Sequence, residues 1–108
     1  MVKSNSHNSL RTALYKYGSI SIALLADNLQ NYKSGIFGRT AKDCPSTDAN
    51  HAVNLVGYGS EAGNLYWIVQ NTWSSRWGES GYFRIHRDTT ESGPGACGMY
   101  SMSSFVHF

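Results

Sequence analysis

The chain is poor in charged residues and has no long apolar segment. Charged side chains make up 15% of its 108 residues and hydrophobic ones 41%, which excludes the composition of a disordered tail. No apolar run approaches the roughly 20 residues that cross a bilayer, and the polar start, Met1–Leu10, cannot be the core of a signal peptide. The net charge is only +2, with scattered basic residues, so nucleic-acid binding is not favoured. We expect one small domain over residues 1–108.

Cysteine is also scarce. The chain has two, Cys44 and Cys97, far apart and without a Cys-x-x-Cys pair. This spacing argues against a structural zinc site. A single disulfide is possible in an oxidising compartment, but composition alone leaves that question open.

Aromatic residues and glycines are plentiful, which favours strands joined by tight turns. One helix is predicted over residues 8–17, because Leu10, Ala13, Leu14 and Tyr17 fall on one face and Gly18 follows. Alternating residues 19–24 predict a half-buried strand. The remaining expectations are a helical turn near Leu29 and Tyr32, a short apolar segment at 35–37, a loop at 39–50, strands at 51–58, 65–71 and 81–87, and one more candidate strand at 99–108.

These elements predict an α+β domain that is mostly β. One helix precedes a run of antiparallel strands, and we expect the small sheet to close on itself. Patterning alone does not choose between a barrel and a sandwich.

Four histidines are candidates for chemistry. His7, His86 and His107 are interpreted as solvated side chains. His51 differs because it opens an apolar strand directly after a polar loop, where catalytic groups are often carried. Taken alone, a core or surface role for His51 is still the commoner one.

A second polar residue, Asn71, ends another predicted strand, where asparagine is usually a turn former. Trp73 and Trp77 follow it in a loop bounded by glycines. Turn chemistry does not explain two tryptophans at this spacing, so we expect them to form an apolar lid over a polar group.

Three segments together carry a family resemblance: HAVNLVGYG at 51–59, YWIVQNTWSSRWGESGYFRI at 66–85 and CGMY at 97–100. In this order they closely resemble the papain-like cysteine peptidases, and the resemblance extends from about Leu10 onward. It implies that the chain is the C-terminal, β-rich lobe of that fold, with a barrel-like antiparallel sheet and one helix.

The resemblance implies roles for the residues singled out above. His51 would pair with a thiolate and then protonate the leaving amine. Asn71 would accept a hydrogen bond from the other ring N–H and so fix the tautomer. Trp73 would shield that hydrogen bond from water, and Trp77 would line the leaving-group side of the cleft.

The resemblance also implies a substrate pocket, a disulfide and a setting. The small-walled pocket would accept an apolar side chain of a peptide or protein substrate, and its residues would be Ala23, Ala49, Asn50, Ala52 and Met102. Cys44 would pair with Cys97. No metal or other cofactor is implied, nor a nucleic-acid or membrane partner. Residence would be lysosomal or secreted, although no targeting signal is present in the sequence.

One feature of the family pattern is absent. The nucleophilic cysteine should lie roughly 130–150 residues before the histidine, yet only 50 residues precede His51. No Cys-Gly-Ser-Cys-Trp segment occurs. The chain alone is therefore expected to be inactive and to need an N-terminal lobe that carries the cysteine. Two alternatives stay open: a non-catalytic module that binds peptides or a partner, and a disulfide-linked β domain without a site.

Overall fold

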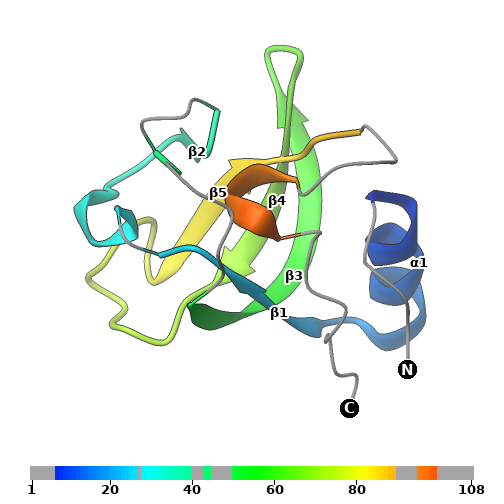
Figure 1. Cartoon of the computed structure of the whole chain (residues 1–108), viewed down its shortest axis with the longest axis horizontal. Coiled ribbons are helices and arrows are strands. Elements are labelled where there is room, and N and C mark those ends of the chain that lie inside the picture. The colour runs from blue at the N-terminus through cyan, green and yellow to red at the C-terminus, as the bar shows by residue number, and fades with distance from the viewer. Residues whose placement is uncertain (1–6, 27, 40–42, 45–49, 90–94, 100–108) are drawn as a thin grey trace.

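The computed structural model describes residues 7–26, 28–39, 43–44, 50–89 and 95–99. One helix and a central sheet dominate it (Figure 1). In chain order the elements are α1 (His7–Tyr17), β1 (Ile20–Leu24), η1 (Leu29–Asn31), β2 (Ile36–Phe37), β3 (His51–Glu61), β4 (Asn64–Gln70), β5 (Tyr82–His86) and η2 (Ala96–Gly98), where η marks a 3-10 turn.

The five strands form one sheet in the order β1-β3-β4-β5-β2. Neighbours pair antiparallel except β2, which runs parallel to β5. The expectation of a wholly antiparallel, closing sheet is therefore wrong: within the described residues β1 and β2 are opposite edges. The physical reason lies in β2, which has only two residues and so offers too little alternation for its partner or direction to be predicted. No local sequence signal encodes that direction.

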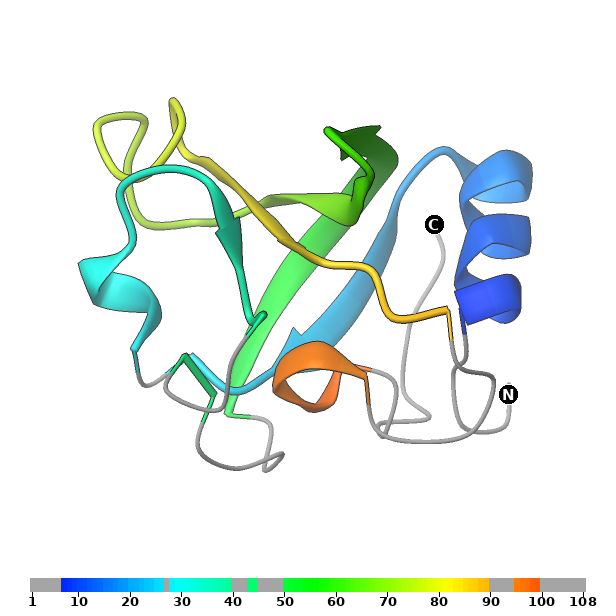
Figure 2. The same cartoon turned by 90° about the horizontal axis from the view of Figure 1, so that it is seen from above.

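The helix α1 begins one residue earlier than predicted. Leu10, Ala13 and Leu14 are buried, as the periodicity indicated, but Tyr17, in the last turn, is 39% exposed. The helix ends at Gly18, whose N–H donates to the Leu14 carbonyl at 2.8 Å and whose φ is +84°. A glycine in this left-handed conformation is a common helix terminator. The two views place α1 at one end of the sheet and η1 at the other (Figures 1 and 2).

The β3–β4 hairpin is longer than predicted. Its strands run to Glu61 and from Asn64, so that only Ala62 and Gly63 form the turn, both with positive φ. Two such residues match the twist of the flanking strands. A bulge between Leu55 and Gly57 interrupts the ladder.

The core lies on one face of the sheet. Alternate residues of β1 and β3 are buried opposite each other, as in the pairs Ile20 with Leu55 and Ile22 with Val53. The largest fully buried side chains include Trp67, Val69, Phe83 and Ile85 from the central strands. Because this face is packed along its length, it fixes the ends of β3 and β4, where the candidate site lies.

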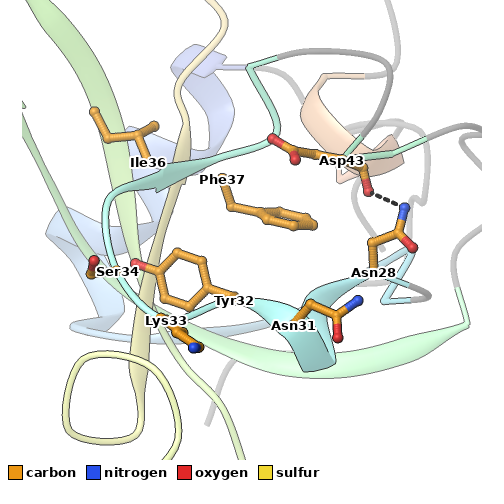
Figure 3. Close-up of a pocket in the computed structure, with 8 residues that line it drawn as sticks. All are labelled: Asn28, Asn31, Tyr32, Lys33, Ser34, Ile36, Phe37 and Asp43. Atoms are coloured by element: carbon orange, nitrogen blue, oxygen red, sulfur yellow. Dashed lines mark hydrogen bonds between the residues drawn. The ribbon is translucent and has the colours of Figure 1, made fainter.

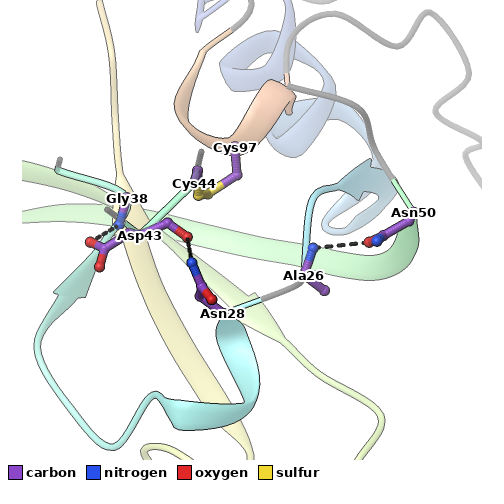
Figure 4. The surroundings of a disulfide bond; sticks show 7 residues. All are labelled: Ala26, Asn28, Gly38, Asp43, Cys44, Asn50 and Cys97. Carbon is purple, nitrogen blue, oxygen red and sulfur yellow. Dashed lines mark hydrogen bonds between the residues drawn. A yellow bond between two sulfur atoms is a disulfide. The ribbon is translucent and has the colours of Figure 1, made fainter. Parts of the chain in front are cut away.

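A disulfide joins Cys44 to Cys97, as the family resemblance implied (Figure 4). It links the loop before β3 to η2, and the N–H of Leu25 donates to the Cys97 carbonyl at 2.9 Å. The candidate strand at 99–108 lies outside the described residues except for Met99, which is buried. Among the described helices, none has the length and apolar character that a membrane crossing requires.

Candidate active site

His51 and Asn71 are brought together by the ends of two neighbouring strands. His51 is the first residue of β3, and Asn71 directly follows β4. Side chains alternate along a strand, so His51 shares the core face with Val53, and Asn71 shares it with Val69. The antiparallel pairing of β3 with β4 therefore places both polar side chains at one end of the same face.

A hydrogen bond of 2.9 Å connects His51 Nε2 to Asn71 Oδ1. The same oxygen accepts the N–H of Thr72 at 2.8 Å, which identifies it as the amide oxygen. Because that oxygen can only accept, Nε2 carries the proton and Nδ1 presents its lone pair. Asn71 is 7% exposed, and its own N–H donates to the Gly81 carbonyl at 3.1 Å. The asparagine is thus a fixed acceptor that sets the tautomer of the imidazole.

Residues 72–81, which we call the tryptophan loop, lie beside this pair. The Trp73 ring lies 5.2 Å from the His51 ring, centroid to centroid, at an angle of 37°. Trp73 meets Trp77 edge-on at 5.1 Å, and Trp77 meets Phe83 at 5.7 Å. Trp73 is 42% exposed, so it forms the boundary between the imidazole and solvent.

The expected substrate pocket is described only in part. Ala23 and Ala52 are directly paired across β1 and β3 and are partly or fully exposed. Asn50 accepts the N–H of Ala26 through its side-chain oxygen at 2.9 Å, and its own N–H donates to the Leu24 carbonyl at 3.0 Å. Asn50 therefore also joins β1 to β3. Ala49 and Met102 lie outside the described residues.

Sequence reasoning assigned no role to two charged residues in and after the tryptophan loop. Glu79, in the tryptophan loop, forms a double hydrogen bond with Arg84 of β5, each contact at 2.9 Å. These bonds hold the pKa of Glu79 below its usual value and raise that of Arg84. An i, i+5 pair across a turn has no helical or strand periodicity, so only the opposite charges themselves could have indicated it.

The other histidines occupy different surroundings. His7 was expected to be solvated, but it is 5% exposed, and its Nε2 lies 3.1 Å from Arg87 Nη1. The helix face that buries Leu10 also carries His7 inward, which corrects that expectation. His86 is half-buried on β5, and His107 lies outside the described residues. In the described part of the chain, no three His, Cys, Asp or Glu side chains gather as metal ligands would.

A cavity of about 440 Å³ opens elsewhere on the molecule (Figure 3). The Tyr32 and Phe37 rings are part of its lining. Asn28 and Asp43 also line it, and the Asn28 side-chain amide donates a hydrogen bond of 3.1 Å to the Asp43 carbonyl. It shares no lining residue with the His51 site. Neither cysteine of the chain is a free thiol, since both are in the disulfide.

A histidine hydrogen-bonded to an asparagine amide is also found in Cys-His-Asn sites. A family model described as "Papain family cysteine protease" matches residues 1–107, and the chain belongs to this family.

The relatives show how much of such a protein this chain represents. It is 42% identical over 100 residues to a cathepsin L-like proteinase of Phaedon cochleariae, covering 93% of this chain and 29% of that protein. It is 45% identical over 106 residues to the probable cysteine protease RD21C of Arabidopsis thaliana, covering 96% and 22%. The chain thus spans less than a third of these curated relatives.

A solved structure agrees with this assignment. The bromelain protease of Ananas comosus, in complex with the E64 inhibitor, superposes with a TM-score of 0.83 at 42% identity. The match covers 98% of this chain and 47% of that one. The mostly-β architecture with one helix therefore corresponds to about half of that protease chain.

Proposed function

We propose that this chain is the C-terminal lobe of a papain-family peptidase and supplies the base and the orienting amide of its Cys-His-Asn site. The observation that carries the proposal is the 2.9 Å hydrogen bond from His51 Nε2 to Asn71 Oδ1. It leaves His51 Nδ1 as the atom that faces a reacting thiol. The thiol itself comes from residues outside these 108, because Cys44 and Cys97 are joined to each other.

The chemistry follows from this proton arrangement. The thiol proton passes to Nδ1, which gives a thiolate–imidazolium pair. The sulfur attacks the peptide carbonyl, and Nδ1 returns the proton to the leaving nitrogen as the C–N bond breaks. Water then hydrolyses the acyl-enzyme with the same imidazole as base. Asn71 orients the ring without adding a negative charge, so the imidazolium is not neutralised by its own support.

Substrate selection is the second part of the proposal. Ala23 and Ala52 are paired across β1 and β3, one position along from the Leu24–His51 pair, and with Ala49, Asn50 and Met102 they would form an apolar subsite. An apolar substrate side chain gains free energy when it leaves water there. A peptide library presented to the complete peptidase should select aliphatic or aromatic residues at this subsite, and a preference for arginine would refute the assignment.

The decisive experiment joins this chain to a papain-family N-terminal lobe that carries the cysteine. Co-expression should give turnover of a fluorogenic dipeptide substrate, and His51→Ala should reduce kcat by about 10³-fold or more. His86→Ala is the matched control, since that histidine is half-buried and ends a different strand, β5. Equal activity of the His51→Ala and unsubstituted proteins would refute the proposal.

A second candidate is a non-catalytic module that binds peptides or a partner protein. The occupied cysteines favour it for the chain by itself, and Trp73, 42% exposed, offers an aromatic contact surface. The two candidates differ in one result: the module would bind the peptide or the N-terminal lobe with no turnover in the joined protein. The disulfide fits an oxidising compartment, so we also propose lysosomal or secreted residence.

A further inference from the structure

One carboxylate joins three separate segments of the chain. Glu79 accepts hydrogen bonds from Arg84 Nε and Nη2, each at 2.9 Å. It also accepts the backbone N–H of Gly35 at 3.2 Å. A guanidinium and a carboxylate that meet through two parallel bonds fix orientation as well as distance. The tryptophan loop is therefore tied both to β5 and to the segment that leads into β2.

The Gly35 contact acts on an aromatic neighbour. The Tyr32 hydroxyl donates to the Gly35 carbonyl at 2.6 Å, and its ring lies 5.4 Å from the Trp77 ring. The backbone of the tryptophan loop is also close to this ring, because a Cβ added to Gly78 would lie only 3.2 Å from it. Tyr32 is 7% exposed, so the carboxylate holds a buried ring against the loop.

Ring contacts continue from that point to the imidazole. Trp77 lies 5.1 Å from Trp73, and Trp73 lies 5.2 Å from His51. Rings at these separations restrict one another's tilt, because each pair has few favourable arrangements. A shift of the tryptophan loop at Glu79 is thus transmitted to the indole that covers the histidine.

We propose that Glu79 is a positioning residue for the His51–Asn71 pair, its carboxylate holding the tryptophan loop so that Trp73 stays over the imidazole. The expected effect of Glu79 on catalysis rests on the proposed function, but the expected effect of Glu79 on the His51 ring does not. Arg84 keeps the pKa of Glu79 below the ordinary value, so the clamp stays charged in mildly acidic solution.

The test compares two isosteric substitutions, each at a glutamate that contacts Arg84. Glu79→Gln keeps the size of the side chain and removes its charge. Glu61→Gln is the matched control, because Glu61 contacts Arg84 Nη1 at the same 2.9 Å but is 62% exposed and belongs to the hairpin. In the chain by itself, the exchange of the His51 Nε2 proton with water is followed by NMR.

Glu79→Gln should accelerate this exchange by about three- to tenfold, the change expected when a hydrogen bond to a charged group is weakened. Glu61→Gln should leave it unchanged. Equal rates in both variants would overturn the proposal. So would a matching acceleration of the backbone amide of Val69, since that would indicate global unfolding and not a local opening of the lid.

The joined peptidase gives an independent measurement. Glu79→Gln should lower kcat by a similar factor and leave KM unchanged, as expected for a misplaced base with an intact substrate pocket. If His51→Ala leaves turnover intact, the proposed function fails while the coupling of Glu79 to the His51 proton still stands. If His51→Ala abolishes turnover but Glu79→Gln changes neither proton exchange nor kcat, only the inference about Glu79 fails.

Discussion

Opening the Cys44–Cys97 disulfide should remove a large share of the stability of the domain. The bridge closes a chain segment with a sequence separation of 53 residues. In the chain-entropy model such a loop restricts the unfolded state by about 4 kcal/mol. The free energy of unfolding of a small domain is only about 5–15 kcal/mol, so the reduced protein should keep only a small part of its stability.

The assay is urea unfolding of the oxidised and the reduced protein, which have identical sequences. With a slope of about 2 kcal/mol per molar urea, the midpoint should fall by about 2 M. A variant with Cys44→Ala and Cys97→Ala should fall slightly further, because Cys97 is 3% exposed and its sulfur fills space in the core. A loss below about 1 kcal/mol on reduction would refute the reasoning from chain entropy.

Two further perturbations test other parts of the structure. Burial raises the pKa of Tyr32 to about 12, above its value in the unfolded chain, so the stability from its neutral form is complete below about pH 10 and disappears between about pH 10 and 12. Absorbance at 295 nm should show one tyrosine that titrates late, and Tyr32→Phe should remove that late step. If all tyrosines of the wild type titrate at the ordinary pKa, Tyr32 is not buried. Gly78→Ala should cost about 1–3 kcal/mol of unfolding free energy, because its φ is +60° and a Cβ would lie 2.7 Å from a carbonyl oxygen. Gly63→Ala, at φ +82° with nothing within 4 Å, should cost less in the same thermal or urea experiment, and equal costs would show that the close contact is unimportant.

The sequence predicted those elements whose periodicity has a single interpretation. The helix was placed within one residue at its start because Leu10, Ala13 and Leu14 repeat at helical spacing. Tyr17 was misassigned because it lies in the last turn, where the helix ends before its face is complete. The hairpin was drawn too short, since Ala62-Gly63 is not among the strong turn pairs such as Asn-Gly.

The sequence drew attention to His51 and Asn71 but not to the contacts around them. His51 and Asn71 were singled out from strand ends and family resemblance, and in the structure His51 Nε2 lies 2.9 Å from Asn71 Oδ1. Glu79 and Arg84 were not singled out, because their contact depends on a turn that brings residues five apart face to face. The parallel pairing of β2 was equally inaccessible, since Ile36 and Arg84 meet only through tertiary structure.

The contact between Trp73 and His51 gives the protein an intrinsic optical reporter. An indole 5.2 Å from an imidazole is close enough for its emission to respond to the state of that ring, and at 42% exposure it also responds to solvent. Trp67 is fully buried and serves as a constant background. A thiol, an inhibitor or a partner surface that arrives at this histidine should therefore be detectable by fluorescence without any added label.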